Sequence, residues 1–266
     1  MHLRILCLEN YLSWLLSIRN SPESTYFFTF HKCASTLFSG YVLKKIIGLR
    51  HADFDLWITH GKQSRPVMFK KKGYMYGPIR LSTGPESQAY KDLVAPTTRV
   101  EFLKDKIALF FLRDPRDILV SAYYSFGYSH PLSHVEATRK YQERQRSRIL
   151  GQSVDEFAME YAPAILNGFE MVETLHQSCS RSIVLRYEDM ILDWDGFATD
   201  LSKYIKIQRT VLNRIYKKSR PRNREEIGAH RRSGKPEGFR SSLTPRTVKC
   251  LNDTFKVVLD RYRYSP

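Results

Sequence analysis

The sequence predicts an α/β protein with three layers, in which helices cover both faces of a mostly parallel central sheet. The first observation is that short apolar runs rich in β-forming residues alternate with longer runs of helical periodicity. The second is that polar and basic residues directly follow several apolar runs, as they do where ligands bind at the carboxyl ends of parallel strands. A chain of 266 residues, 42% of them hydrophobic, can bury such a sheet.

We expect four strands separated by helices. The strands are predicted at residues 26–30, 73–79, 107–112 and 183–187. The helices are predicted at residues 36–47, 116–126, 154–178, 194–205 and 245–259, with a basic helix that could face a partner or substrate at residues 139–149. Because the sequence shows no internal repeat and no low-complexity linker, we expect one domain over residues 1–266, with its core at residues 23–245.

Residues 1–22 are predicted to form an amphipathic helical segment that packs on this domain. Arg4, Glu9 and Arg19 interrupt the apolar residues, and the uncharged runs are shorter than the roughly 20 residues that span a bilayer. The segment also lacks a small-residue cleavage site. We therefore expect no transmembrane segment and a cytoplasmic location, with a role at a membrane surface as the alternative.

The charge and the cysteines narrow the choice of ligands. The chain has 43 Lys and Arg residues against 27 Asp and Glu residues, a net charge of +16. Such a surface attracts nucleic acid, acidic polysaccharide, membrane headgroups or phosphorylated cofactors. The four cysteines, at positions 7, 33, 179 and 250, form no CxxC pair and have no metal-ligand spacing, so we expect reduced thiols and no metal site.

Residues 31–36, "HKCAST", stand between the first strand and the first helix, where α/β proteins direct backbone N–H groups and a helix dipole at an anion. The segment lacks the glycines of the nucleotide-binding loop G-x-x-x-x-G-K-S/T, and no acidic residue ends a strand to hold Mg²⁺, which disfavours an ATPase or kinase. We predict a metal-independent anion site built from Lys32, Cys33, Ala34, Ser35 and Thr36. In the alternative interpretation, a hydroxyl merely caps the helix and the lysine is solvated.

A second anion site is predicted at the end of the strand at 107–112. Arg113 follows this strand, and Asp114 and Pro115 are typical of an N-cap and a first helical residue. Ser121 lies two turns into the helix, so it can converge with Arg113 on one anion. The alternative is that Arg113 only pairs with Asp114 or Asp117.

Two further segments support an aromatic, phosphorylated ligand. Tyr187 is predicted to end the last strand, where its ring could flank a base, although the acids that follow it are also typical of a helix start. Residues 230–244, "HRRSGKPEGFRSSLT", are dense in arginine and glycine, which suit bidentate phosphate contacts and close backbone approach.

Together these segments resemble the sulfotransferases that use 3′-phosphoadenosine 5′-phosphosulfate (PAPS). The family loop for the 5′-phosphosulfate, P/S-K-x-G-S/T-S/T, is matched by Lys32, Ser35 and Thr36, with Ala34 in the glycine position. The family segment for the 3′-phosphate, R-N/D-P-K/R-D-x-x-x-S, is matched over residues 113–121. The resemblance extends in order and spacing from about residue 26 to residue 243.

The C-terminal motifs of the family are also present. The tyrosine of the Y-E-D segment, which contacts the adenine, corresponds to Tyr187. The segment R-K-G-K-P-G-D-W-K/R aligns with residues 232–240, which implies cofactor contacts from Arg232, Ser233 and Gly234. Leu37 replaces a tryptophan that often follows the loop, so Phe239 is a candidate for adenine stacking.

The resemblance implies a fold like that of the P-loop NTPases and a metal-independent transfer of the sulfuryl group from PAPS to a hydroxyl or amine. The product would be adenosine 3′,5′-bisphosphate (PAP), and Lys32 would neutralise charge on the leaving phosphate. The acceptor would be a small molecule or a carbohydrate, and no nucleic-acid partner is expected.

The general base is the point at which the sequence departs from the family. Cytosolic members carry a histidine about two dozen residues before the 3′-phosphate arginine, and residues 79–88 here contain none. His60 is our first choice, because an imidazole pKa suits proton abstraction near neutral pH. Asp55, Glu86 and His130 are the alternatives.

Two other functions fit parts of the sequence. A nucleic-acid-binding protein would use the charge of +16, but it leaves the order of Lys32, Arg113 and Ser121 without an explanation. An inactive relative that binds PAP agrees with the missing histidine. Cofactor binding and turnover distinguish the three hypotheses.

Overall fold

The computed structural model describes residues 21–54, 69–81, 92, 94–134, 136–221 and 234–266. Within these residues, five strands form one sheet in the order β2-β3-β1-β4-β5. The strands are β1 (Thr25–Thr29), β2 (Arg50–Asp53), β3 (Tyr74–Arg80), β4 (Ile107–Leu112) and β5 (Arg181–Arg186). Every pair of neighbouring strands is parallel, so the carboxyl ends of the strands lie at one edge of the sheet.

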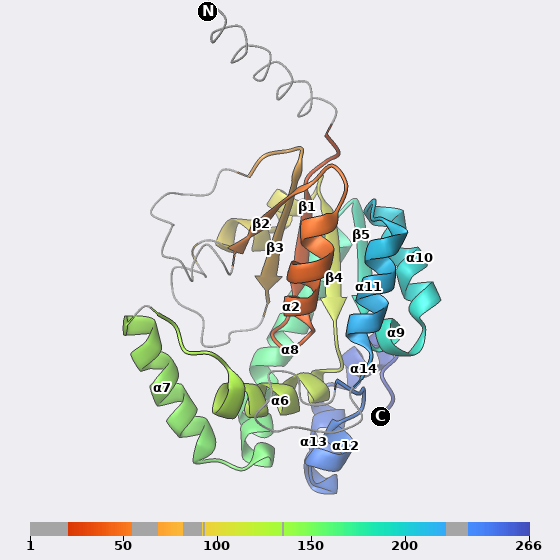
Figure 1. The fold of residues 1–266 in the computed structure, drawn as a ribbon. Helices are drawn as coiled ribbons and strands as arrows, with labels where there is room; N and C mark the ends of the chain where they lie inside the picture. Colours follow the sequence, from red (N-terminus) through yellow and green to blue (C-terminus); the bar gives the residue numbers. More distant parts are fainter. Residues whose placement is uncertain (1–20, 55–68, 82–91, 93, 135, 222–233) are drawn as a thin grey trace, which may run out of the picture.

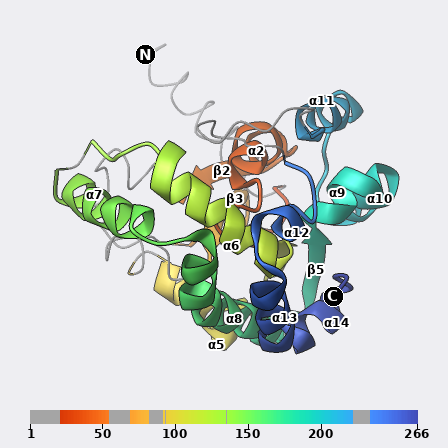
Figure 2. The same cartoon turned by 90° about the horizontal axis from the view of Figure 1, so that it is seen from below.

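Helices cover both faces of the sheet, as Figures 1 and 2 show, and the predicted three-layer α/β architecture is confirmed. One face carries α2 (Ser35–Leu37), the turns η1 (Phe38–Val42) and η2 (Leu43–Lys45), α10 (Trp194–Tyr204) and α11 (Arg209–Ser219). The other carries α5 (Val100–Leu103), α8 (Val154–Ser178), α13 (Pro245–Thr254) and α14 (Lys256–Tyr262). The remaining turns and helices are η3 (Ala95–Thr98), α6 (Pro115–Tyr124), η4 (Ser125–Ser129), α7 (Glu136–Leu150), α9 (Tyr187–Leu192) and α12 (Phe239–Ser242).

The core consists largely of aromatic rings stacked on the two central strands. Successive residues of a strand point to opposite faces, so Phe27 and Phe28 of β1 lie in different layers. Phe27 stacks on Phe38 of η1 with ring centroids 5.2 Å apart, and Phe38 also packs on Phe111 at 4.2 Å. Phe28 stacks on Phe110 at 5.0 Å in the layer that α8 covers. Burial of large rings on both faces holds β1 and β4 rigidly at the centre of the molecule.

The structure corrects several predicted boundaries. The helix predicted at 36–47 is interrupted, because it widens into a π-helical turn over Phe38–Val42 around Gly40, a weak helix former. The helix predicted at 245–259 is two helices, which meet at Phe255. Tyr187 does not end a strand; it begins α9, because the acids after it favour a helix N-terminus.

Strand β2 and helix α11 are among the elements that were not predicted. Strand β2 has only four residues, too few for a two-residue hydrophobic period to stand out. Helix α11 is clearly amphipathic, with Val211, Leu212 and Ile215 at helical spacing beside four basic residues, so its pattern could have been recognised in the sequence. Helix α11 lines the site described below, and β2 pairs with β3, which ends beside that site.

Candidate functional site

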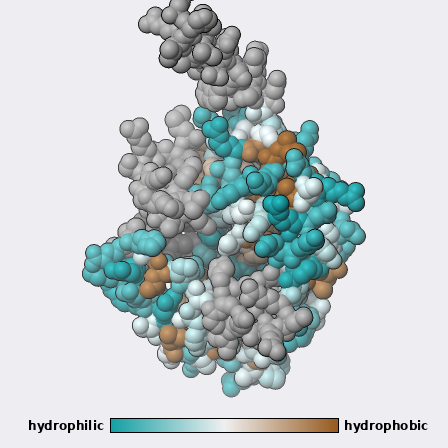
Figure 3. All heavy atoms as spheres, viewed as in Figure 1, coloured by the Kyte–Doolittle hydropathy of each residue, from teal (hydrophilic) through white to brown (hydrophobic). Residues whose placement is uncertain are grey.

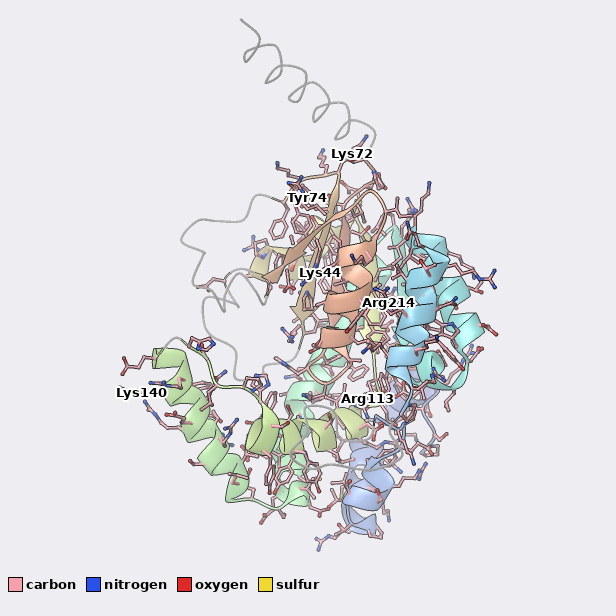
Figure 4. The ribbon with its side chains drawn as sticks, viewed as in Figure 1. Lys44, Lys72, Tyr74, Arg113, Lys140 and Arg214 are labelled. Carbon is pink, nitrogen blue, oxygen red and sulfur yellow. The ribbon has the colours of Figure 1, made fainter. Side chains whose placement is uncertain are left out.

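A cavity of about 280 Å³ lies at the carboxyl ends of β1 and β4, between α2 and α11. Figure 4 shows Arg113, which lines this cavity, at the end of β4. The cavity is lined by residues of four predicted segments, namely Lys32, Ala34, Ser35, Thr36, Arg113, Ser121, Tyr187 and Gly234. The fold therefore brings together residues that are up to 200 positions apart in the chain.

The loop after β1 has an unusual backbone. Lys32 and Ala34 adopt left-handed conformations with φ of 68° and 53°, which side chains other than glycine rarely adopt. Ala34 stands immediately before α2, at the position where the resembling family has glycine. Such strain persists only where the surrounding structure enforces it, and here it brings Ser35 and Thr36 to the cavity wall.

Lys32 is held from two sides. Its Nζ donates a hydrogen bond to Ser125 Oγ at 2.6 Å, and its backbone carbonyl accepts one from Arg113 at 3.1 Å. Burial, together with the positive charges of Arg80 and Arg113, lowers the pKa of Lys32 to about 8. Three cations therefore converge on this part of the cavity, which favours an anionic ligand.

Arg113 is 9% exposed and links three segments. Its guanidinium donates to Asp117 at 3.3 Å and lies 4.6 Å from the centre of the Tyr187 ring. Burial alone would lower the pKa of Arg113, but Asp117, Tyr187 and Glu188 raise it above its ordinary value. Among the described residues, the buried Nε has no hydrogen-bond partner. The predicted pairing with Asp117 therefore exists, and it uses only part of the hydrogen-bonding capacity of a guanidinium that also lines the cavity.

Neighbouring residues fix the position of this arginine. Asp114 caps α6 by accepting from the backbone N–H of Arg116 at 2.9 Å, so the predicted N-cap is confirmed. Arg116 is fully buried, bonded to both carboxylate oxygens of Asp114, and does not line the cavity. Asp117 also accepts from the backbone N–H of Phe239 at 2.9 Å, which ties the C-terminal segment to α6.

Residues 99–263 match the family model of the sulfotransferase domain, which is more than half of the chain. The chain belongs to the sulfotransferase family. A search of curated protein sequences finds no match. The family match includes the Arg113 and Tyr187 segments, whereas the Lys32 loop precedes it.

A solved sulfotransferase structure shares the fold of this sulfotransferase. It is a mouse sulfotransferase, SULT7A1, complexed with PAP, with a TM-score of 0.53 and 11% sequence identity, over 89% of this chain and 84% of that chain. A retinol dehydratase in complex with androsterone and the inactive cofactor PAP aligns with a TM-score of 0.48 and 16% identity, over 91% of this chain and 83% of that chain. At these identities, the likeness concerns the fold.

Some predicted site residues of the sulfotransferase do not line the cavity. The side chain of Cys33 is buried in the core, and burial raises the pKa of its thiol to about 12, so the thiol stays protonated and unreactive. Phe239 is fully buried against the Arg116 guanidinium at 4.1 Å and does not line the cavity, so its suggested stacking on adenine is wrong. Arg232 and Ser233 lie outside the described residues.

The candidate bases are mostly outside the described part of the chain, namely Asp55, His60 and Glu86. His130 is described, and its ring packs on Phe126 with centroids 5.5 Å apart. It lines a separate small cavity with Phe126 and Arg146, and it does not line the cavity that contains Lys32.

Two basic residues of the site were missed in the sequence. Arg80 ends β3, and its guanidinium donates to Ser35 Oγ at 3.5 Å. It stands directly after an apolar run, as Arg113 does, so the same reasoning could have found it. Lys218 of α11 lines the cavity with its Nζ 5.9 Å from the centre of the Tyr41 ring. Lys218 was missed because α11, although amphipathic, was not predicted.

The described residues contain no group of three or more His, Cys, Asp or Glu side chains arranged to hold a metal ion. Within the same described ranges, no helix has the length and apolar character that crossing a membrane requires.

Proposed function

We propose that this protein is a PAPS-dependent sulfotransferase, which transfers the sulfuryl group to a hydroxyl or amine of a small-molecule or carbohydrate acceptor and releases PAP. The observation that carries the proposal is that one cavity contains Lys32, Arg113 and Ser121, the charged and hydroxyl residues of two separate motifs. The site is cationic and rigid, as recognition of a bisphosphorylated nucleotide requires. We also propose that residues 1–266 form one domain, since strands from both halves of the described chain share one sheet.

Each residue then has a distinct role. The N–H groups and hydroxyls of Ser35 and Thr36 bind the 5′-phosphosulfate together with Lys32. The guanidinium of Arg113 and the hydroxyl of Ser121 bind the 3′-phosphate. The Tyr187 ring and Gly234 line the nucleoside part, where the tyrosine hydroxyl donates to the Gly234 carbonyl.

In the transfer step, the acceptor oxygen or nitrogen attacks the sulfur while the bond from sulfur to the bridging oxygen breaks. The electron pair of that bond passes to the phosphate of PAP, and the acceptor proton passes to the general base. Lys32 stabilises the negative charge that builds on the leaving phosphate. We keep His60 as the proposed base, with Asp55 and Glu86 as alternatives, whereas the separate cavity of His130 disfavours that residue.

Turnover without an acceptor tests the proposal, because water can replace the acceptor as a slow nucleophile. The purified protein, incubated with PAPS and EDTA, is expected to release PAP and inorganic sulfate in equal amounts. Chromatography of the nucleotide and counting of labelled sulfate measure both products. Production of PAP only after Mg²⁺ is added, or unchanged PAPS throughout, would contradict the proposal.

The low pKa of Lys32 predicts a pH dependence of PAP binding. With a pKa of about 8 in the free protein, Lys32 loses its charge as the pH rises through that value. Because the 5′-phosphate favours the charged lysine, the affinity for PAP is expected to fall by up to about tenfold per pH unit above about pH 8. Calorimetric titrations between about pH 7 and about pH 10 measure this change.

Replacement of Lys32 by arginine provides the control for this prediction. A guanidinium stays charged throughout the range, so Lys32→Arg is expected to abolish the decline, whatever affinity it starts from. The same decline in Lys32→Arg as in the wild type would show that another group is responsible.

A further inference from the structure

The amino-terminal edge of the sheet carries a second basic surface, at the opposite end of the strands from the cavity. We define the cationic rim as six basic residues with exposed side chains, namely Lys45, Arg50, Lys70, Lys71, Lys72 and Lys206. Figure 4 shows Lys72 and Arg113 toward opposite ends of the sheet. The rim is therefore not part of the cofactor site.

Backbone hydrogen bonds join the segments of the rim into one surface. The N–H of Ser24 donates to the carbonyl of Lys71, and the N–H of Arg50 to the carbonyl of Gly73, both at 2.8 Å. The N–H of Ile47 donates to the carbonyl of Lys206, also at 2.8 Å. Because these bonds fix the backbones, the like charges cannot separate, and their summed field attracts an extended anionic surface.

The charges of the rim are not neutralised within the described part of the chain. None of the six rim residues forms an ion pair with a described acid, and Glu23, the acid beside Lys72 in the backbone pairing, is paired with Arg181 at 3.3 Å. Two of the cations lie near the same aromatic ring, since Lys70 Nζ and Arg50 Cζ are 5.6 Å and 6.0 Å from the centre of the Tyr74 ring. These exposed cations are therefore available to an external anionic surface.

Apolar side chains accompany these charges. Ile47 is 50% exposed in the segment between Lys45 and Arg50, and Figure 3 shows hydrophobic atoms at this end of the molecule, bordered by hydrophilic ones. The carbonyl of Pro22 accepts from the N–H of Gly73 at 2.9 Å, so residues 1–20 join the chain directly beside the rim. Their sequence contains six leucines, two isoleucines and one tryptophan.

We propose that the cationic rim docks this protein onto a membrane surface rich in anionic lipid. Anionic lipid headgroups attract the positive charges of the rim, and the boundary between headgroups and acyl chains accepts the neighbouring apolar side chains. Each of these two interactions is weak alone, but together they give stable membrane association. A nucleic acid would satisfy the charges and leave the apolar side chains exposed. Docked in this way, the protein turns its cavity away from the membrane.

Sedimentation of the full chain with lipid vesicles tests this proposal. The vesicles consist of phosphatidylcholine alone, or of phosphatidylcholine with about 30 mol% phosphatidylserine. The rim variant carries Lys70→Glu, Lys71→Glu and Lys72→Glu. The matched control carries Arg139→Glu, Lys140→Glu and Arg144→Glu, the same charge change on the exposed face of α7, where Figure 4 marks Lys140.

We expect the wild type to bind only the phosphatidylserine vesicles and to dissociate at high salt. The rim variant is expected to bind them at least about tenfold more weakly, and the control within about twofold of the wild type. PAP titration of both variants, expected to match the wild type, shows that each is folded. Binding of the same proteins to duplex DNA is measured in parallel. Three results would overturn the proposal: the wild type shows no binding that depends on phosphatidylserine, both variants lose vesicle binding equally, or the rim variant loses binding to DNA but keeps its binding to the vesicles.

Discussion

Replacement of Lys32 by alanine is expected to reduce sulfuryl transfer by about 10²–10³-fold, since removal of one preorganised group at a developing negative charge costs that much in other enzymes. The cavity is also lined by Arg113, Lys218 and Lys235, but the charge of Arg113 is engaged by Asp117, and the two other lysines belong to distant segments. No other described ammonium in the cavity lies in the loop that follows β1. Release of PAP from PAPS in EDTA measures the loss.

The control for this variant is Lys44→Ala, which removes an exposed lysine near the end of the same helical segment. It changes the net charge equally, so its rate is expected to stay within about twofold of the wild type. Cooperative thermal unfolding of both variants checks that they fold. A Lys32→Ala protein that kept most of its activity would refute the proposed role of the lysine.

Replacement of Arg113 by alanine is expected to weaken PAP binding by about 100-fold, more than it slows the transfer step. The change removes a buried charge-assisted contact to the 3′-phosphate, and it also releases the Lys32 carbonyl and Asp117. Arg113→Lys keeps the charge but lacks the planar fork, so an intermediate affinity is expected. Calorimetric titration with PAP measures all three proteins.

The matched control here is Arg246→Ala, on the exposed side of α13. Its affinity for PAP is expected to equal that of the wild type. Arg113→Ala with wild-type affinity for PAP and an intact fold would show that the second anion site is misassigned.

The layers of the fold could be predicted because buried strands and helix starts both leave local patterns in the sequence. Buried strands such as Ile107–Leu112 are continuous apolar runs, and α8 begins with a capping box at Ser153 and Glu156. Asp114 and Pro115 likewise mark the start of α6 from sequence alone. Strand β2 has no such local signal and was missed, whereas α11 was missed although its amphipathic pattern is clear.

The site was predictable only in part, because its geometry depends on contacts between distant segments. Arg113 was found from its place after a strand, but its bond to the Lys32 carbonyl joins residues 81 positions apart. Phe239 aligned with a family tryptophan, yet packing against Arg116 buries it completely. A motif fixes the residue type at a position, whereas the direction of its side chain depends on the neighbours that pack against it.

Calorimetric titration of PAP into the purified protein, without Mg²⁺ and with ATP as the control ligand, tests the central claim most directly. We expect micromolar binding of PAP at one site, because the cavity has two anion sites for its two phosphates. We expect no measurable binding of ATP, because the described residues offer no site for the metal ion that accompanies it. Binding of ATP that requires Mg²⁺, or no binding of PAP, would contradict the account.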